Sequence, residues 1–324
     1  MRIVHFGSYW MGENDIVALM ARDLQKAAPD SRIVDTELYS ARPSLWTERE
    51  GQVNWIRDAK IEPLMHYNPE VMILNSGGMS LRPETAWRLR NQGVTLVGIS
   101  LSDPDVFAAQ GSQYARLYDL FYTNARRALK DYEAIGVQAR LLPFAASADF
   151  HRPLPEVDKK YDVIIVGHPR ADRLEVVREL DKHFKVGVYG KGWKRLGILP
   201  RGSQVNGEAH VRALNSGKVY LSFSATVAGF VNVKVGLFEA VACGTPVFTE
   251  VFDEMEDYFT YGKEVVGYND LDDLVTKLKA YLAEPHRLGL IAQNARTRLL
   301  REHTWEARWR SVLNDIATTR TGLQ

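Results

Sequence analysis

The feature that most constrains the fold is an alternation of short apolar runs and amphipathic segments. Runs of four to six apolar residues are typical of strands buried on both faces of a parallel sheet, and the segments between them have the periodicity of covering helices. Before residue 151 we predict strands over residues 2–6, 71–74, 95–99 and 140–143, and helices over residues 15–28, 83–91 and 125–135. This pattern predicts a first α/β domain over residues 1–150.

The same alternation restarts after residue 160. We predict strands over residues 162–167, 185–189, 219–223 and 245–249, and helices over residues 172–184, 208–216, 235–243, 271–283, 286–302 and 305–317. Between the two series, residues 151–160 hold two prolines and a run of charge, which interrupt helix and sheet and predict a linker. The second α/β domain is then expected over residues 161–304, followed by a helix and tail over 305–324. Because ligands bind beyond the carboxyl ends of parallel strands, two such domains predict a cleft between them.

Composition excludes several classes of protein. The chain is 45% hydrophobic and 25% charged, as in ordinary globular proteins. Its formal net charge of +1 gives no overall field for nucleic acid or an anionic membrane. Cys243 is the only cysteine, so an internal disulfide and a cysteine-based zinc site are excluded. With no leader pattern and no run of 18 apolar residues, we expect a cytoplasmic protein without a membrane span.

Two glycine-containing turns in the first half are candidates for ligand contact. Gly7 follows the first predicted strand, and Tyr9, Trp10 and Asn14 lie between it and the next helix. Ser76 and Gly77 follow the second strand in the same way. Such turns let a ligand approach the backbone near a helix N-terminus, although a plain βα turn explains them equally well. The spacing does not match the G-x-G-x-x-G dinucleotide motif, which disfavours a nicotinamide-dependent oxidoreductase. His5, inside the first strand, is interpreted as a core histidine with its hydrogen bonds satisfied.

Basic and glycine residues in the second half point to an anion. Gly167 ends a strand, and Arg170 and Arg173 fall in the first turn of the next helix. Cations there oppose the helix dipole unless an anion such as a diphosphate offsets them; two solvated arginines are the alternative. Gly190 ends the following strand, but its surroundings lack the Ser or Thr of a P-loop.

The segment from Phe230 to Val247 is the most informative. Asn232 is a plausible N-cap, so the amides after it, with Val233 and the Lys234 ammonium, are candidates for holding phosphate oxygens. Glu239 follows on an otherwise apolar helix, where a carboxylate needs hydrogen-bond donors such as sugar hydroxyls. A capping or salt-bridging glutamate is the alternative.

This segment resembles a known family. Residues 238–247, FEAVACGTPV, are similar to the E-A-x-A-x-G-x-P-V stretch of sugar-nucleotide glycosyltransferases with the GT-B fold. The resemblance continues through residues 261–274 and Glu302-His303-Thr304-Trp305, and upstream through Leu142-Pro143-Phe144-Ala145 and Phe150-His151-Arg152-Pro153. Together these stretches cover most of residues 118–310 and are closest to the branch named after spore maturation protein B, CgeB.

The resemblance implies two Rossmann-like domains facing across a cleft, with the C-terminal helix returning toward the first. It implies transfer of a sugar, favouring a hexose, from a nucleotide-diphosphate donor, favouring a UDP-sugar. The second domain would bind the donor: Glu239 would hold the ribose hydroxyls, and the amides from Asn232 to Val235 would face the diphosphate, with Arg170, Arg173 or Lys234 as counter-charges. No cofactor and no metal would be required. Val231 stands where retaining members often have an earlier glutamate, so the stereochemistry stays open.

The catalytic residue and the acceptor are the least determined. Asp103, in the loop after the strand at 95–99, is the candidate base or acceptor-orienting carboxylate, with a turn-forming Asp before Pro104 as the alternative. No His/Asp/Glu group has metal-ligand spacing along the sequence. The acceptor expected in the first domain is a glycan, a small molecule or a modified base in DNA. The last option rests on aromatic and basic residues such as Trp46, Trp55, Trp87, Arg42, Arg88 and Arg90. A non-catalytic sugar-nucleotide-binding protein is the alternative of a different class.

Overall fold

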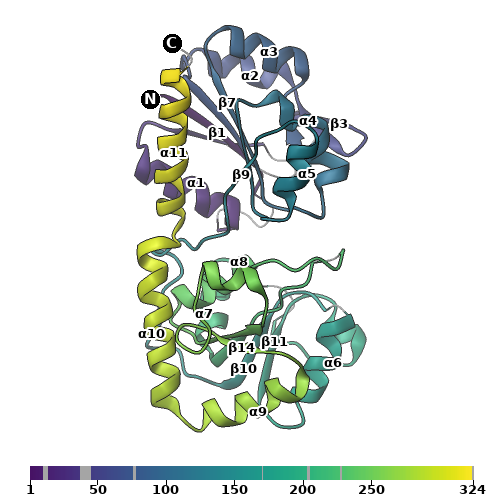
Figure 1. Cartoon of the computed structure of the whole chain (residues 1–324), viewed down its shortest axis with the longest axis vertical. Helices are drawn as coiled ribbons and strands as arrows, with labels where there is room; N and C mark the ends of the chain where they lie inside the picture. The colour runs from purple at the N-terminus through teal and green to yellow at the C-terminus, as the bar shows by residue number, and fades with distance from the viewer. Residues whose placement is uncertain are drawn as a thin grey trace. The chain divides into compact units, whose positions relative to one another are not determined.

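The computed structural model forms two compact units, Met1–Phe144 with Trp305–Gln324, and Ala145–Thr304 (Figure 1). It describes residues 1–9, 14–36, 45–75, 78–169, 171–202, 205–226 and 228–322. The boundary at Ala145 places residues 151–160, predicted as a linker, inside the second unit. There the Leu154 amide donates to Asn215 Oδ1 at 2.9 Å, and the Asn215 side-chain amide donates to the Arg152 carbonyl at 3.0 Å.

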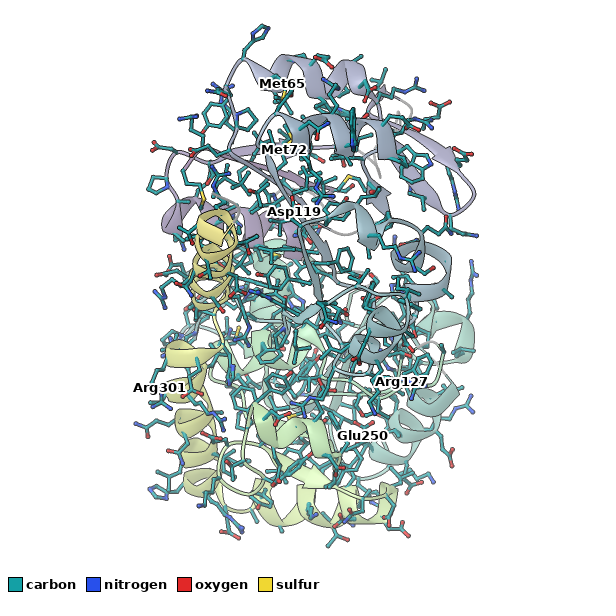
Figure 2. All side chains as sticks on the ribbon, turned by 45° about the horizontal axis from the view of Figure 1, so that its top comes forward. Met65, Met72, Asp119, Arg127, Glu250 and Arg301 are labelled. Carbon is teal, nitrogen blue, oxygen red and sulfur yellow. The ribbon has the colours of Figure 1, made fainter. Side chains whose placement is uncertain are left out.

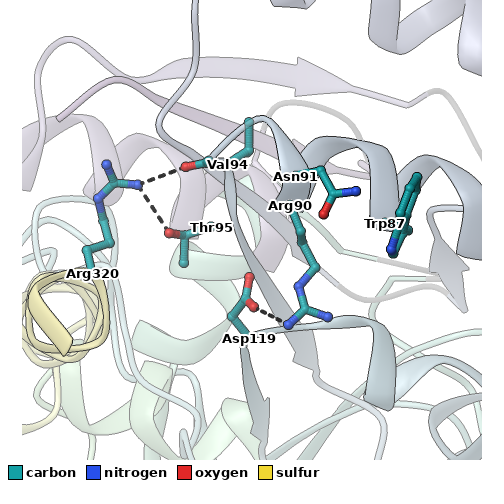
Figure 3. A pocket seen from close by; sticks show the side chains of 8 residues that line it. Trp87, Arg90, Asn91, Val94, Thr95, Asp119 and Arg320 are labelled. Atoms are coloured by element: carbon teal, nitrogen blue, oxygen red, sulfur yellow. Dashed lines mark hydrogen bonds and ion pairs between the residues drawn. The ribbon is translucent and has the colours of Figure 1, made fainter. Parts of the chain in front are cut away.

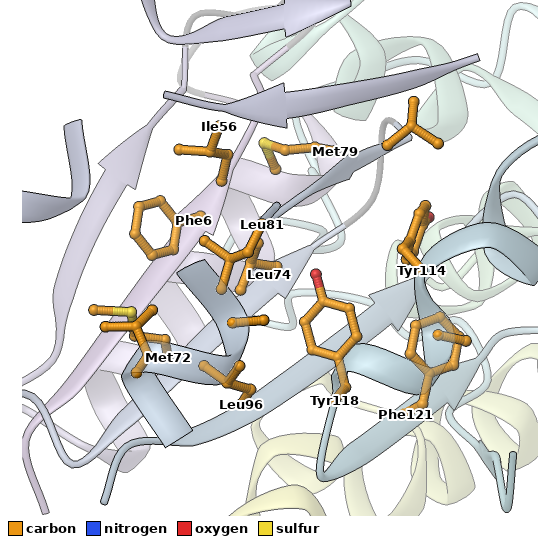
Figure 4. Close-up of a cluster of buried hydrophobic side chains, with 14 of the residues drawn as sticks. Phe6, Ile56, Met72, Leu74, Met79, Leu81, Leu96, Tyr114, Tyr118 and Phe121 are labelled. Carbon is orange, nitrogen blue, oxygen red and sulfur yellow. The ribbon is translucent and has the colours of Figure 1, made fainter. Parts of the chain in front are cut away.

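The first unit contains a six-stranded sheet in the order β2-β1-β5-β7-β8-β9, and each neighbouring pair is parallel. Its strands are β1 (Ile3–Gly7), β2 (Arg32–Asp35), β5 (Val71–Asn75), β7 (Thr95–Ser100), β8 (Leu120–Thr123) and β9 (Arg140–Leu141). A smaller sheet pairs β3 (Thr47–Glu50), β4 (Val53–Ile56) and β6 (Met79–Ser80). The core between sheet and helices contains Phe6, Met72, Leu96 and Phe121 (Figure 4).

The helices of the first unit are α1 (Ile16–Ala27), α2 (Asp58–Met65), α3 (Pro83–Asn91), α4 (Ser112–Tyr114), α5 (Ala128–Ala134) and α11 (Trp305–Gly322). Short helical turns lie at Phe107–Gly111 and Ala115–Leu117. The last helix, α11, contacts α1 (Figure 1). The buried Trp309 indole donates to the Met20 carbonyl at 2.7 Å, and Tyr122 donates to Asp315 at 2.8 Å. The helix that follows the second unit in sequence thus belongs to the first.

The second unit contains a five-stranded parallel sheet in the order β11-β10-β12-β13-β14. Its strands are β10 (Tyr161–Val166), β11 (Val186–Tyr189), β12 (Gly217–Leu221), β13 (Val247–Glu250) and β14 (Val266–Tyr268). Its helices are α6 (Ala171–Leu180), α7 (Gly207–Asn215), α8 (Val235–Ala242), α9 (Leu271–Leu282) and α10 (Pro285–Glu302), with short turns at Trp193–Leu196 and Asp253–Asp257.

Both sheets are doubly wound around their first strand. The chain leaves β1 for β2 on one side and reaches β5 on the other; in the second unit β10 lies between β11 and β12. The predicted α/β class with two parallel sheets is therefore confirmed, whereas the predicted facing of the two domains stays a prediction. Among the described helices, none is long and apolar enough to cross a lipid bilayer.

Candidate functional site

The carboxyl edge of the second sheet brings two predicted glycines together. Gly167 follows β10 and Gly190 follows β11, with φ of 142° and 144°. A Cβ on Gly190 would lie 2.0 Å from the Gly167 carbonyl oxygen, so no other residue fits there. That carbonyl accepts a hydrogen bond from the Trp193 indole at 2.7 Å. The backbone is consequently tight at the end of β10, and the Trp193 and Arg173 side chains pack against it. At this point the strand order reverses, and ligands of such sheets bind there.

Arg173 supplies a positive charge at the same place. Its side chain is largely buried, and its Nη1 donates to the His168 carbonyl at 3.0 Å. The guanidinium carbon lies 4.9 Å from the centre of the Phe223 ring, just beyond the end of β12. Arg173 therefore lies between the ends of β10 and β12, and its role as a counter-charge to an anion stays a prediction. Arg170 lies outside the described residues.

The N-cap of α8 differs from the prediction. The helix begins at Val235, as predicted, but its N-cap is Lys234, so the prediction of Asn232 as N-cap is wrong. The Asn232 amide instead donates to the Ser224 carbonyl at 3.1 Å. Asn232 and Val233 are buried, and Asn232 Oδ1 accepts from the Lys234 ammonium. The Lys234 side chain does not cap α8 in the part of the chain that the structure describes, so the first amides of the helix keep the capacity to bind an anion.

Glu250 is a residue at this edge that the sequence analysis did not select. It ends β13 (Figure 2), and its Oε2 accepts from the Ser224 amide at 3.1 Å and from the Ser224 hydroxyl at 2.9 Å. The sequence signal that could have identified Glu250 is its position as an acidic residue directly after a predicted buried strand. Its hydrogen bonds fix the loop after β12, which carries Phe223.

Glu239 has two histidine neighbours. Its Oε2 lies 2.9 Å from His210 Nε2, and its Oε1 lies 3.5 Å from His151 Nε2. Burial opposes ionisation, but the charges of His151 and His210 and the hydrogen bond to His210 lower the pKa of Glu239 to about 2. A carboxylate has about four acceptor sites, so these contacts leave room for hydroxyl donors. The assignment to ribose stays a prediction.

These three side chains form a group that could hold a metal ion. His151, His210 and Glu239 each offer one ligand atom, and the three atoms lie within 4.8 Å of one another. The residues come from the loop after Ala145, from α7 and from α8, so their spacing along the chain carries no metal signal. The search for metal-ligand spacing therefore missed a group that folding creates.

The carboxyl edge of the first sheet has a different character. Gly7 ends β1, where a Cβ would lie 2.7 Å from Val17 and 3.2 Å from the Tyr9 ring. At the start of α1, Asp15 Oδ1 accepts from the amides of Val17 and Ala18 at 2.8 and 3.0 Å. The anion site that this helix start suggested is thus filled by the chain's own carboxylate.

The other acceptor-side predictions lie around the same turn. Burial, together with the charges of Asp35 and Asp15, raises the pKa of Tyr9 to about 12, so its hydroxyl is neutral. Asn14 accepts a hydrogen bond from Arg22 at 3.0 Å. Trp10, Ser76 and Gly77 lie outside the described residues.

Four buried polar side chains at this edge have atoms without a hydrogen-bond partner among the described residues. They are both ring nitrogens of His5, the hydroxyls of Ser8 and Thr36, and Asn75 Oδ1. Burial lowers the pKa of His5 to about 3, so the ring is neutral, and it packs edge-on against Trp309. His5 therefore lies in the core as predicted, but within the described ranges its hydrogen bonds are not satisfied, contrary to the prediction. Buried polar atoms of this kind call for an explanation, such as a bound ligand or water.

Asp103 is held inside the first unit. Its Oδ2 accepts from the Thr123 hydroxyl at 2.7 Å and from the Tyr132 hydroxyl at 3.0 Å, and its amide donates to Asn124 at 3.0 Å. Burial raises the pKa of Asp103, opposed by these hydrogen bonds. A raised pKa suits a proton acceptor near neutral pH, but the side chain is only 2% exposed. Its catalytic role stays a prediction.

A cavity of about 690 Å³ lies elsewhere in the first unit (Figure 3). It is lined by Trp87, Arg90, Asp119 and Arg320, among others, near Thr95 at the amino end of β7. Arg90 pairs with Asp119 at 2.7 Å, and Arg320 donates to Thr95 at 3.1 Å. Trp87 is 70% exposed. The cavity is at the opposite end of the strand from Asp103 and does not coincide with the predicted site.

Comparison with known proteins supports the fold. Residues 170–314 match the model of a family described as glycosyl transferase-like. None of the curated protein sequences matches the chain. Among solved structures, sucrose-phosphate synthase from Thermosynechococcus elongatus has a TM-score of 0.67 at 14% identity, covering 100% of both chains.

Two further structures are similar over nearly the whole chain. Anabaena HepE in complex with UDP-glucose has a TM-score of 0.68 at 12% identity, covering 98% of this chain and 100% of HepE. AviGT4, a glycosyltransferase involved in avilamycin A biosynthesis, has a TM-score of 0.63 at 16% identity, covering 99% and 98%. The chain therefore has the fold of the GT-B glycosyltransferases, and its glycosyl transferase-like segment contains the carboxyl edge of the second sheet from Arg173 to Glu250.

Proposed function

We propose that this protein is a glycosyltransferase that moves a sugar from a nucleotide-diphosphate sugar to an acceptor. The carrying observation is the carboxyl edge of the second sheet at the ends of β10 and β12. It combines the close-packed glycine backbone at Gly167 and Gly190 with the Arg173 guanidinium. The uncapped start of α8 belongs to the loop that follows β12. This combination suits a diphosphate, because amides and a fixed cation stabilise its charge without a bound cofactor.

A UDP-sugar is the donor we propose. HepE, similar in fold, was solved with UDP-glucose. In this assignment the second unit binds the nucleotide, Lys234 approaches the diphosphate from the N-cap of α8, and Glu239 accepts from the ribose hydroxyls.

The first unit then binds the acceptor. The unpartnered atoms of Ser8, Thr36 and Asn75 are neutral hydroxyl and carbonyl groups, and they suit a hydroxyl-rich acceptor better than an anionic one. The acceptor hydroxyl attacks the anomeric carbon, the bond from that carbon to the diphosphate oxygen breaks, and the nucleotide leaves with the electron pair. The hydroxyl proton goes to a base, for which Asp103 is the candidate.

The test is nucleotide binding by the full chain and by two arginine variants in α6. UDP should raise the melting temperature, and Arg173→Gln should weaken UDP binding at least about tenfold, the loss of roughly one charge-assisted contact. Arg178→Gln is the matched control, because Arg178 lies on the same helix and only reaches the Leu196 carbonyl at the surface. Slow release of sugar from UDP-sugar without acceptor would separate an enzyme from a binding protein. Equal UDP affinity in wild type and Arg173→Gln would show that the edge around Arg173 is not part of the donor site.

A DNA acceptor carrying a modified base is the second candidate, favoured by the exposed Trp87 beside the Arg90 cavity. Salt-dependent DNA binding that Trp87→Ala weakens would support it, and donor turnover indifferent to DNA would exclude it.

A further inference from the structure

We propose that His151, His210 and Glu239 form a site for one divalent transition-metal ion of the zinc class. The ligand atoms are Nε2 of each histidine and one carboxylate oxygen of Glu239. This site shares Glu239 with the proposed donor site, but its existence does not depend on the proposed function.

The distances fit a tetrahedral ion. Zinc binds imidazole nitrogen and carboxylate oxygen at about 2.0–2.2 Å, which places neighbouring ligand atoms about 3.3 Å apart. His151 Nε2 lies 3.5 Å from Glu239 Oε1 and His210 Nε2 lies 2.9 Å from Glu239 Oε2, and one ligand atom from each of the three residues lies within 4.8 Å of the other two. Small side-chain rotations would bring the two imidazoles onto a common ion.

The chemistry of the group favours a metal over an ordinary ion pair. Imidazole and carboxylate ligands suit zinc and its neighbours in the first transition row. Glu239 bonds to no arginine or lysine in the described part of the chain; its partners are the two histidines. Nearby Cys243 and Tyr220 are buried, and neither side chain can carry a positive charge, so neither supplies a counter-charge. A divalent ion would offset the buried carboxylate while the imidazoles stay neutral, as metal ligation requires.

The position in the fold defines what the ion would do. His151 lies in the segment that begins the second unit, His210 lies on α7 and Glu239 on α8, so one ion would tie three segments together. The His210 side chain is 17% exposed while that of His151 is 3% exposed, so the group opens on the His210 side. Three protein ligands leave a fourth position for a water or a ligand oxygen. A carboxylate that binds the metal through one oxygen keeps the other for a hydroxyl donor.

The experiment is metal titration of the untagged full chain after chelator dialysis. Zn²⁺ affinity is measured by calorimetry, and Co²⁺ absorption reports the coordination geometry. We expect one ion per chain with a tetrahedral Co²⁺ spectrum. His210→Ala and Glu239→Gln should weaken binding by at least about 100-fold, since even the partners of metal ligands are worth about 10–100-fold. Circular dichroism without metal checks that each variant folds; His151→Ala is secondary because His151 is buried.

His183→Ala is the matched control. His183 forms a surface pair with Glu179 at 3.2 Å in the same unit, so its loss should leave Zn²⁺ binding unchanged. Wild type that binds Zn²⁺ no more tightly than folded His210→Ala, or an equal loss in His183→Ala, would overturn the proposal. Zn²⁺ binding that the variants abolish supports it whether or not UDP binds, so failure of the donor assignment is seen separately.

Discussion

The carboxyl edges of the two sheets share one architecture but differ in the chemistry of the side chains around them. Each lies where a doubly wound sheet reverses its strand order. In the first unit the helix after the first strand, α1, is capped by Asp15, and the polar atoms nearby are neutral and unpartnered. In the second unit a buried arginine lies beside two glycines in contact, and α8 has no N-cap side-chain bond in the described part of the chain. The residue at the helix start thus differs between the two edges, and under the donor assignment proposed above this residue, rather than the fold, decides whether an edge accepts an anion.

The largest effect should come from breaking the tight edge of the second unit. Gly190→Ala places a Cβ 2.0 Å from the Gly167 carbonyl, so the backbone must move. We expect a loss of about 4 kcal/mol or more in the free energy of unfolding, at the severe end for single substitutions. Urea denaturation measures it. Gly197→Ala is the control, because Gly197 has φ 79° but no atom within 4 Å of its Cβ; its loss should be about 1 kcal/mol. Equal losses would show that the contact with Gly167 contributes nothing.

The next largest effect is a dependence of the stability of the first unit on pH, caused by His5. The folded-state pKa of His5 is lowered to about 3 by burial, whereas the unfolded value is about 6.5. Below pH 6.5 the unfolded chain binds a proton that the folded chain does not, so stability falls as the pH falls toward 3. At pH 4.5 the loss is about 3 kcal/mol.

His5→Leu removes the titrating group and its unpartnered nitrogens at similar volume. The difference in unfolding free energy between this variant and wild type should grow in favour of the variant as the pH falls from 6.5 to 4.5. Unfolding titrations across that range check it. Parallel pH curves would show that His5 carries a proton in the folded state.

The smallest effect is expected from a substitution that makes the helix start in the first unit resemble the one in the second unit. Asp15→Ala uncaps α1 and should cost about 1 kcal/mol, the usual value of an N-cap. Because the freed amides of Val17 and Ala18 resemble the start of α8, inorganic phosphate should restore part of this stability. Thermal melts with and without phosphate measure it. Asp270→Ala, which uncaps α9 by losing the bond from the Asp273 amide, gives a comparison in the second unit. If phosphate has no effect on the stability of Asp15→Ala, the residue at the helix start does not decide whether an edge accepts an anion.

Much of the fold was predictable because both sheets are built from continuous apolar strands. The helix Pro83–Asn91 was predicted with its observed ends, since Pro83 marks the first turn and Gly93 follows it. The strands β2, β8 and β14 were missed, although β9, β11 and β13 also have four residues or fewer and were predicted. In β2 and β14 only two residues are apolar, which is too few to separate a strand from a loop.

The site was less predictable because its contacts join distant segments. Gly167, Gly190 and Arg173 could be selected since glycine and arginine at strand ends have a local meaning. The extended backbone at Asn232 depends on Ser224, and the histidines beside Glu239 come from other elements. The spacing of these residues along the sequence does not predict that they are in contact.

The place of α11 bears on the order in which the chain folds during synthesis. The second unit is one continuous segment, whereas the first needs Trp309, Asp315 and their neighbours from the end of the chain. The first unit therefore cannot be completed until the whole second unit has been translated. Until then, the side of α1 that contacts Trp309 is uncovered. The unit whose synthesis begins first is the last to be finished.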